Sequence, residues 1–297
     1  MPAISAATPW RIAGLTAAAM LAFAGNSLLC RVALKQTDID AASFTSLRLV
    51  SGTLVLAQLV IARGAPPATG APAARPWHSG DWGSALAMFV YAAGFSFAYI
   101  QLSAATGALL LFGMVQATMI GWGLWRGERL LPLQWLGLAA AVAGLVLLLL
   151  PGLATPSLVA AALMASAGVG WAVYTLRGRR PGLGSGDATA VTAGNFLRAT
   201  PLALVLSGVL WTQARWDGHG IALALASGAL ASGLGYAIWY TALRGLNATR
   251  AATVQLTVPA LATGGGVLLL GEPLTAHVLG ASVAVLGGMA LVIAAKR

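Results

Sequence analysis

The stretch that decides the fold is PLQWLGLAAAVAGLVLLLL, residues 132–150, in which no side chain carries a charge. A helix needs about 20 apolar residues to cross the hydrocarbon core of a bilayer, and this stretch has that length. The whole chain has a similar character, with 59% hydrophobic residues, 8% charged residues and a mean hydropathy of +0.84. A soluble domain has about 25% charged residues. We therefore predict an all-α integral membrane protein with several spans and no soluble catalytic domain.

On either side of residues 132–150, further segments reach spanning length, and Gly- and Pro-rich breaks separate them. The segment between 64 and 76 holds four prolines and is expected to be a loop. Ten transmembrane helices are expected, at residues 10–31, 41–62, 82–102, 105–125, 132–150, 156–176, 188–210, 220–243, 248–270 and 274–295.

The basic residues are distributed unevenly between the two sides of these spans. Twelve lysines and arginines fall on the side of the termini, whereas only Arg31, Lys35 and Arg215 fall in loops on the other side. Because Lys and Arg are retained in cytoplasmic loops, both termini are predicted to be cytoplasmic, which requires an even number of spans. The net charge of +10 is thus interpreted as an orientation signal, and no nucleic-acid partner is expected. With Cys30 as the only cysteine, no intrachain disulfide is possible, and no cofactor or metal site is predicted.

The two halves of the chain share local matches in the same order, 141 to 150 residues apart. They predict a first five-helix repeat at residues 1–151 and a second at 152–297. An odd number of spans per repeat turns the second copy upside down, which is a recurrent basis for alternating access, with a substrate site near the midplane between the repeats. The matching pairs are Leu47-Arg48 with Leu197-Arg198, 94–99 with 235–240, Gly127-Glu128 with Gly271-Glu272, and Leu136-Gly137 with Leu279-Gly280.

Several of these motifs carry a family resemblance. Gly271-Glu272-Pro273-Leu274, followed by Leu279-Gly280, and the stretch from Gly235 through Arg250 to Pro259 resemble the closing helices of the drug/metabolite transporter (DMT) superfamily, EamA type. Phe23-Ala24-Gly25-Asn26 resembles the Trp-Gly-Ser-Asn opening of that family with Phe in place of Trp, and Trp171-Ala172-Val173-Tyr174 resembles its counterpart in the sixth span.

Within the superfamily the chain looks most similar to the amino-acid exporters, in particular those of aromatic amino acids. The resemblance implies ten helices, a central cavity lined by helices one, three, four, six, eight and nine, and export of a small-molecule substrate through the bacterial inner membrane. The motif positions Asn26, Trp171 and Tyr174 are accordingly candidate substrate-binding residues.

Aromatic side chains provide further candidates for substrate binding. Tyr91, Phe95 and Tyr99 recur at a spacing of four in the third span and so share a helix face, as do Tyr236 and Tyr240 in the eighth, with Trp239 beside them. Ring faces attract a cationic ammonium group, and phenol groups form hydrogen bonds, which suits an amphipathic metabolite. The alternative is that these rings face lipid or form the interfacial belts of the membrane.

Polar side chains within the spans need partners in hydrocarbon. Asn26, Gln116 and Gln255 are interpreted as cavity residues, although they could join helices instead, and for Asn195 a structural hydrogen bond is favoured. The in-span arginines at 48 and 198 occupy matched positions, either as paired anchors for a substrate carboxylate or, as we favour, as paired structural struts. Pro259 indicates either a gating kink or a tolerated bend.

The acidic residues all lie in loops or at span ends, so no carboxylate is available at depth to carry a coupling proton. Facilitated diffusion or exchange by a secondary transporter is therefore predicted. A drug or nucleotide-sugar carrier is the alternative within transport, and a lipid-modifying membrane enzyme is disfavoured because Glu128 and Glu272 have no His or Asp neighbours. Small residues at 280, 284 and 288 are expected to pack within one chain, giving a monomer or a weak homodimer.

Overall fold

The computed structural model describes residues 9–63, 76–150, 157–178, 187–243, 245–246, 251 and 254–295. All regular structure in these ranges is helical, which confirms the all-α prediction. The helices are α1 (Pro9–Gln36), α2 (Ala41–Arg63), η1 (Pro76–His78), α3 (Trp82–Tyr99), α4 (Ala104–Trp125), α5 (Pro132–Leu149), α6 (Leu158–Gly178), α7 (Ala188–Val209), η2 (Trp211–Gln213), α8 (Gly218–Ala226), η3 (Ser227–Leu234), α9 (Gly235–Leu243), α11 (Thr257–Leu270) and α12 (Ala276–Ala294).

Seven of the described helices are long and apolar enough to cross a membrane, counting α8, η3 and α9 as one continuous helix. These seven are α1, α2, α4, α5, α6, α8–η3–α9 and α12. Together with α3, α7 and α11 they coincide with the expected spans. The protein is a multi-pass membrane protein.

Local sequence explains where several of these helices begin. Asp81, Ser103, Asp217 and Thr275 each accept a hydrogen bond from a backbone N–H in the first turn of the helix that follows. Such side chains satisfy N–H groups that have no partner within the helix. Pro132 occupies the first turn of α5, where its missing N–H costs nothing.

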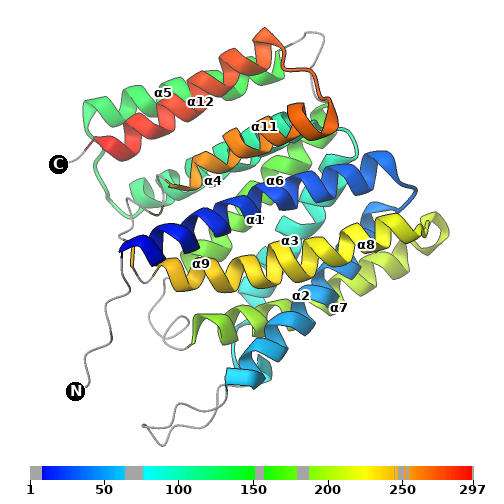
Figure 1. Cartoon of the computed structure of the whole chain (residues 1–297). Coiled ribbons are helices and arrows are strands. Elements are labelled where there is room, and N and C mark those ends of the chain that lie inside the picture. The colour runs from blue at the N-terminus through cyan, green and yellow to red at the C-terminus, as the bar shows by residue number, and fades with distance from the viewer. Residues whose placement is uncertain are drawn as a thin grey trace, which may run out of the picture.

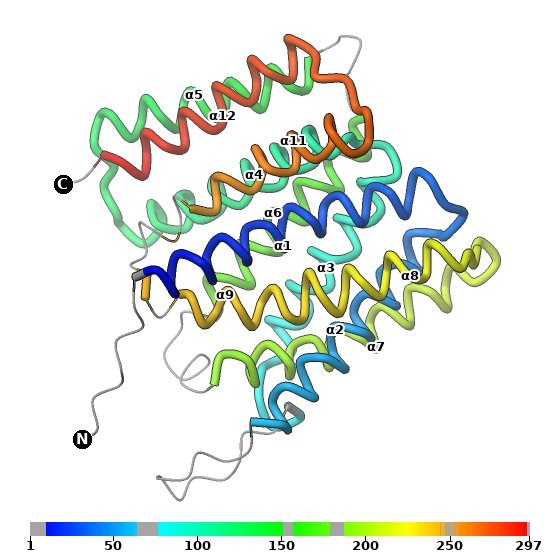
Figure 2. Tube along the Cα trace, in the orientation of Figure 1, coloured from blue at the N-terminus to red at the C-terminus, as the bar shows by residue number. Residues whose placement is uncertain are grey.

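The helices lie roughly side by side in successive layers, with α1 near the centre (Figure 1). The α5–α12 pair forms one outer layer, α4 and α11 lie beneath it, and α2 and α7 form the opposite outer layer, as the trace in Figure 2 also shows. The N-terminal end of α1 and the C-terminal end of α12 lie at the same face of the bundle, at the left of Figure 1. We call this the terminal face and the other end the distal face.

The helix contacts come in matched sets. Helix α5 packs on α12, α4 on α11 and α2 on α7, so each of these helices contacts the one that holds the same place in the other half of the chain. Likewise α1 packs on α9 and α11, while α6 packs on α3 and α4.

Small residues bring α5 and α12 into close contact. A Cβ atom at Gly137 would lie 2.5 Å from the carbonyl oxygen of Gly288, and one at Gly144 would lie 2.8 Å from the Cβ of Ala284. Because glycine lets backbones approach this closely, these positions join two helices of one chain. The expected packing of this small-residue strip within one chain is confirmed.

Two spans differ from the regular helices that the sequence led us to expect. The ninth, expected at 248–270, is interrupted by a turn at Leu256, and α11 begins at Thr257. Pro259 accounts for this, since its ring clashes with the carbonyl of residue 255 and it lacks an N–H to donate. The eighth span contains η3, a π-helical segment of eight residues that includes Gly228 and Ser232. Such segments are rare in helices and are frequent at functional sites.

Candidate functional site

A central cavity of about 410 Å³ lies where the two halves of the bundle meet. The helices that contribute are α1, α3, α4, α6, η3–α9 and the residues just before α11. These are the six spans that the family resemblance implied. The lining residues are Phe23, Asn26, Ser27, Tyr91, Phe95, Leu111, Phe112, Trp171, Ala231, Tyr236 and Gln255.

Aromatic rings in mutual contact make up most of the cavity wall. Trp171 lies at the centre of the cluster, with ring centroids 5.1 Å from Tyr91, 5.2 Å from Tyr236 and 6.3 Å from Phe23. Phe95 extends the cluster from Tyr91 at 5.5 Å. All five rings come from different turns of four helices, so the cluster joins both halves of the chain while presenting ring faces and edges to a ligand.

A hydrogen-bond network runs behind this wall. Asn26 accepts a hydrogen bond from Ser227 Oγ at 2.6 Å and donates one to the Tyr91 hydroxyl at 3.5 Å. The Arg48 guanidinium donates to the same hydroxyl at 3.1 Å through Nη2 and to Ser232 Oγ at 3.1 Å through Nε. The guanidinium also lies 5.1 Å from the ring centroid of Tyr91, within cation–π range. The π-helical segment thus supplies both serines of the network.

A second, larger cavity of about 970 Å³ continues from the first toward the terminal face. Trp171 and Gln255 line both cavities, and the break at Leu256 is what places Gln255 there. The larger cavity reaches Gly178 and Leu243, which are helix ends at the terminal face. Three further residues that the sequence predicted to bind substrate line this larger cavity, namely Tyr174, Trp239 and Tyr240.

An ion pair lies at the rim of the larger cavity. Arg177 Nη2 and Asp81 Oδ1 are 2.6 Å apart, and Ser84 donates both its backbone N–H and its hydroxyl to the Asp81 carboxylate. Burial alone would raise the pKa of Asp81, but the hydrogen bonds from Ser84 and Arg177 outweigh it and hold the pKa below its usual range. Asp81 is therefore ionised at neutral pH and holds the start of α3 to the end of α6.

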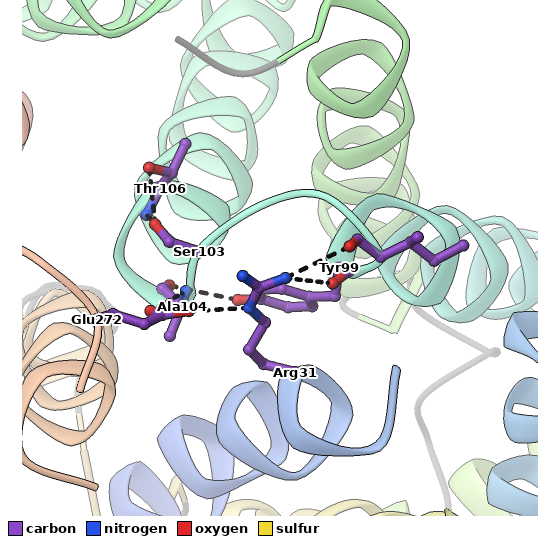
Figure 3. Close-up of polar contacts among 7 residues, drawn as sticks. Arg31, Tyr99, Ser103, Ala104, Thr106 and Glu272 are labelled. Carbon is purple, nitrogen blue, oxygen red and sulfur yellow. Dashed lines mark hydrogen bonds and ion pairs between the residues drawn. The ribbon is translucent and has the colours of Figure 1, made fainter. Parts of the chain in front are cut away.

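A charged cluster at the distal face joins α1 to the start of α4 (Figure 3). Arg31 Nε and Glu272 Oε1 are 2.8 Å apart, and the two side chains are 12% and 13% exposed. Glu272 also accepts a hydrogen bond from the backbone N–H of Ala104 at 2.8 Å, and Arg31 donates to the carbonyl oxygen of Tyr99 at 3.0 Å. The cluster ties α1 to the α3–α4 turn and to the loop before α12. We call these four residues the distal gate.

The sequence-predicted residues divide between the two cavities, the gate and one other place. Tyr99, whose carbonyl oxygen belongs to the distal gate, is fully buried with its ring centroid 4.7 Å from that of Phe95, so it does not belong to a lipid-facing belt. Gln116 does not line the central cavity. It follows Phe112 by one turn of α4 and lies with Gly113, Ala117 and Ile120 against α5 and α12. The central-cavity predictions are Asn26, Tyr91, Phe95, Trp171, Tyr236 and Gln255.

The two in-span arginines, predicted to act as a pair, have different surroundings. Arg198 donates to the backbone carbonyl oxygens of Ser79, Gly194 and Trp77, so it fastens the η1 turn to α7 at the terminal face. It is a structural strut, as expected. Arg48 instead lies behind the cavity wall at 1% exposure. The difference comes from the neighbouring segments, because the segment around η1 offers carbonyl oxygens to Arg198, whereas α3 and η3 offer hydroxyl groups to Arg48.

Sequence reasoning missed the distal gate and the cavity role of Phe112. Arg31 and Glu272 are 241 residues apart, and hydropathy alone does not pair them. The signal was present nevertheless, since Arg31 is one of the few basic residues on the distal side and Glu272 ends a span on the same side.

Comparison with known proteins agrees with this architecture. Residues 158–294 match the EamA-like transporter family. The chain is 57% identical to the uncharacterized protein PA1977 of Pseudomonas aeruginosa over 282 residues, which cover 95% of this chain and 94% of that protein. This family match covers the second half of the chain, from the start of α6 to the end of α12.

Other relatives of this chain have named functions or known folds. The threonine/homoserine exporter RhtA is 36% identical in Salmonella typhimurium and 34% identical in Escherichia coli over 149 residues, about half of each chain. A crystal structure superimposes with a TM-score of 0.66 at 19% sequence identity, covering 95% of this chain and 96% of that one, and so shares its fold.

Proposed function

We propose that this protein is an EamA-like secondary transporter that exports amino acids, aromatic ones included, across the bacterial inner membrane by alternating access. One observation carries the proposal. A central aromatic cavity continues into a larger cavity toward the terminal face, while a charged cluster joins α1 to the start of α4 at the distal face. A binding site accessible from one side and sealed from the other is one half of an alternating-access cycle.

The two halves, residues 1–151 and 152–297, are proposed to be inverted five-helix repeats. The matched helix contacts support this, because exchanging each helix for its counterpart reproduces the most extensive contacts, such as α3 on α6 with α9 on α1, and α4 on α6 with α11 on α1. The distribution of Lys and Arg supports a cytoplasmic location for both termini. The conformation described here then has its open cavity toward the cytoplasm, where an exporter loads its substrate.

Cavity size and lining support an amino acid as the substrate. The central cavity is smaller than the cavity into which it continues and is lined mostly by aromatic rings, which favours a small metabolite over a nucleotide sugar. Aromatic rings can pack on an apolar side chain and attract an ammonium group, while Asn26 and Gln255 supply hydrogen bonds. The relationship to a threonine/homoserine exporter gives independent support for this substrate class.

Transport is proposed to run down the substrate gradient, by facilitated diffusion or exchange. All seven acidic residues are among the described residues, and they lie in loops or in helix-end turns. Without a carboxylate at the central cavity, a proton has no acid at the midplane to load and release.

The proposal is tested by counterflow of a labelled amino-acid panel in proteoliposomes. Phe95→Ala removes a ring from the cavity wall and should reduce counterflow at least tenfold. Phe97→Ala is the matched control, because this ring lies on the same helix and lines a surface depression beside Leu34 and Leu210. Counterflow of no amino acid by wild-type protein would overturn the proposal, as would equal loss in both variants.

A further inference from the structure

Arg48 is a buried positive charge with no negative partner. Its side chain is the largest of the fully buried ones, at 1% exposure, and lies seven residues into α2, about 10 Å along the helix from its distal end. The ion pairs among the described residues are Arg31–Glu272, Arg63–Asp187 and Arg177–Asp81, none of which includes Arg48. Because every acidic residue of the chain is described and lies elsewhere, the protein does not neutralise this charge itself.

The polar groups that surround Arg48 leave a surplus of hydrogen-bond donors. Within the described part of the chain, Arg48 Nη1 and the Tyr236 hydroxyl are buried without a hydrogen-bond partner. The Tyr91 oxygen already accepts from both Arg48 and Asn26, so both of its lone pairs are in use and it offers no acceptor to the two unpartnered groups. Buried donors are normally satisfied, and an exception at a cavity indicates a missing acceptor.

Tyr91 and Tyr236 line the central cavity, and Arg48 lies directly behind its wall. The guanidinium of Arg48 is 5.1 Å from the ring centroids of Tyr91 and Phe95, which separate it from the cavity. Arg48 also donates to Ser232, which precedes Tyr236 by about one helical turn, so the two groups lie on the same side of the cavity. The charge and the unused donors therefore converge on one side of the cavity, opposite the larger cavity through which a ligand would enter.

We propose that this side of the cavity is a carboxylate site, in which Arg48 and Tyr236 bind the carboxylate of the transported amino acid. An ionised carboxylate only accepts hydrogen bonds, and its two oxygens offer about four acceptor positions, which suits a planar guanidinium beside two phenols. The ligand supplies the negative charge that the protein lacks. The ammonium group and side chain then face the aromatic wall around Trp171.

A structural strut is the competing interpretation of Arg48, and Arg198 shows what a strut looks like in this chain. Arg198 directs its guanidinium to three backbone carbonyl oxygens. Arg48 bonds to two side-chain hydroxyl oxygens and leaves one nitrogen unused. A strut needs no unsatisfied donor, whereas a binding group requires one.

The test compares the binding of an amino acid with the binding of its carboxamide. It rests on the proposed function only because that function suggests amino acids as the probes. Binding of L-threonine, L-phenylalanine and their carboxamides is measured by thermal stabilisation of the purified full chain. The amide lacks the negative charge that pairs with Arg48, and losing one partner of a buried charged pair costs about 2 kcal/mol or more. We therefore expect wild-type protein to bind each acid at least about 30-fold more tightly than its amide. That ratio should fall to near one in Arg48→Gln and to an intermediate value in Tyr236→Phe. It should remain unchanged in the matched control Arg198→Gln.

A structural role would weaken the acid and the amide together and leave their ratio intact. The inference is overturned by a wild-type ratio near one, by failure of the acids to bind, or by an unchanged ratio in Arg48→Gln. If Arg48→Gln does not fold, Arg48→Lys replaces it, because lysine keeps the charge but loses the planar fork of the guanidinium. An acid-to-amide ratio that is unchanged in both Arg48→Lys and Tyr236→Phe then overturns the inference. Acid-selective binding without counterflow would reject the proposed transport of these amino acids and support the carboxylate site. Counterflow of acids and amides alike would support transport and reject the carboxylate site.

Discussion

Glu272→Gln should open the distal face of the transporter. The carboxylate of Glu272 accepts from Arg31 Nε and from the Ala104 N–H, each at 2.8 Å. A glutamine keeps one acceptor oxygen but turns its amide hydrogens toward one of these two donors. A hydrogen bond to a charged group contributes about 1.5–3 kcal/mol, and breaking a buried ion pair costs about 3–5 kcal/mol. For side chains that are 12% and 13% exposed we expect a loss of about 2–3 kcal/mol.

If the gate stabilises the distally closed state, this loss moves the equilibrium toward the distally open state by about 30- to 140-fold. The only cysteine reports on it. Cys30 is fully buried beside Arg31, so a membrane-impermeant maleimide should label wild-type protein slowly and Glu272→Gln much faster. Labelling is followed by mass shift in nanodiscs, with and without substrate.

The matched control is Asp81→Asn, which removes an ion pair of similar geometry from the terminal face. It should leave Cys30 protected. The reasoning is refuted if Glu272→Gln labels within twofold of wild type, or if Asp81→Asn accelerates labelling equally, because the effect would then be general loosening of the bundle.

Three further predictions follow from other features. The pKa of Asp81 is lower in the folded state, so the stability that its carboxylate contributes is complete above the unfolded-state pKa of about 4 and is lost as the pH falls through the folded-state pKa. The difference in melting temperature between wild type and Asp81→Asn should therefore shrink between pH 6 and pH 3. A Cβ at Gly228 would collide with the carbonyl oxygen of Arg48, so Gly228→Ala should destabilise the fold by about 1–3 kcal/mol in thermal unfolding, whereas Gly121→Ala, which meets open space, should not. A pH step imposed on proteoliposomes with equal substrate on both sides should drive no accumulation, and uphill flux would contradict the proposed lack of proton coupling.

Hydropathy predicted the positions of the spans because burial in lipid constrains whole segments of about 20 residues. It did not predict which way a side chain faces within a span, as Gln116 shows. Hydropathy does not distinguish an amide that faces the central cavity from one that faces a neighbouring helix. The packing of α4 against α5 and α12 decides the environment of Gln116. The sequence repeat treated Arg48 and Arg198 as equivalent, yet their environments depend on neighbours from other helices. The Arg31–Glu272 pair likewise joins distant loops, and no local periodicity encodes that contact.

In the π-helical segment η3 each backbone hydrogen bond spans one residue more than in an α-helix, so the segment holds at least one residue in excess of α-helical winding. One residue corresponds to about 100° of rotation in an α-helix. If η3 rewound as an α-helix, α9 would turn by at least that angle relative to α8, and Tyr236 would leave the cavity while Ser227 kept its bond to Asn26. Substrate release could then be achieved by axial rotation of half a span, without any tilt of the helices around it.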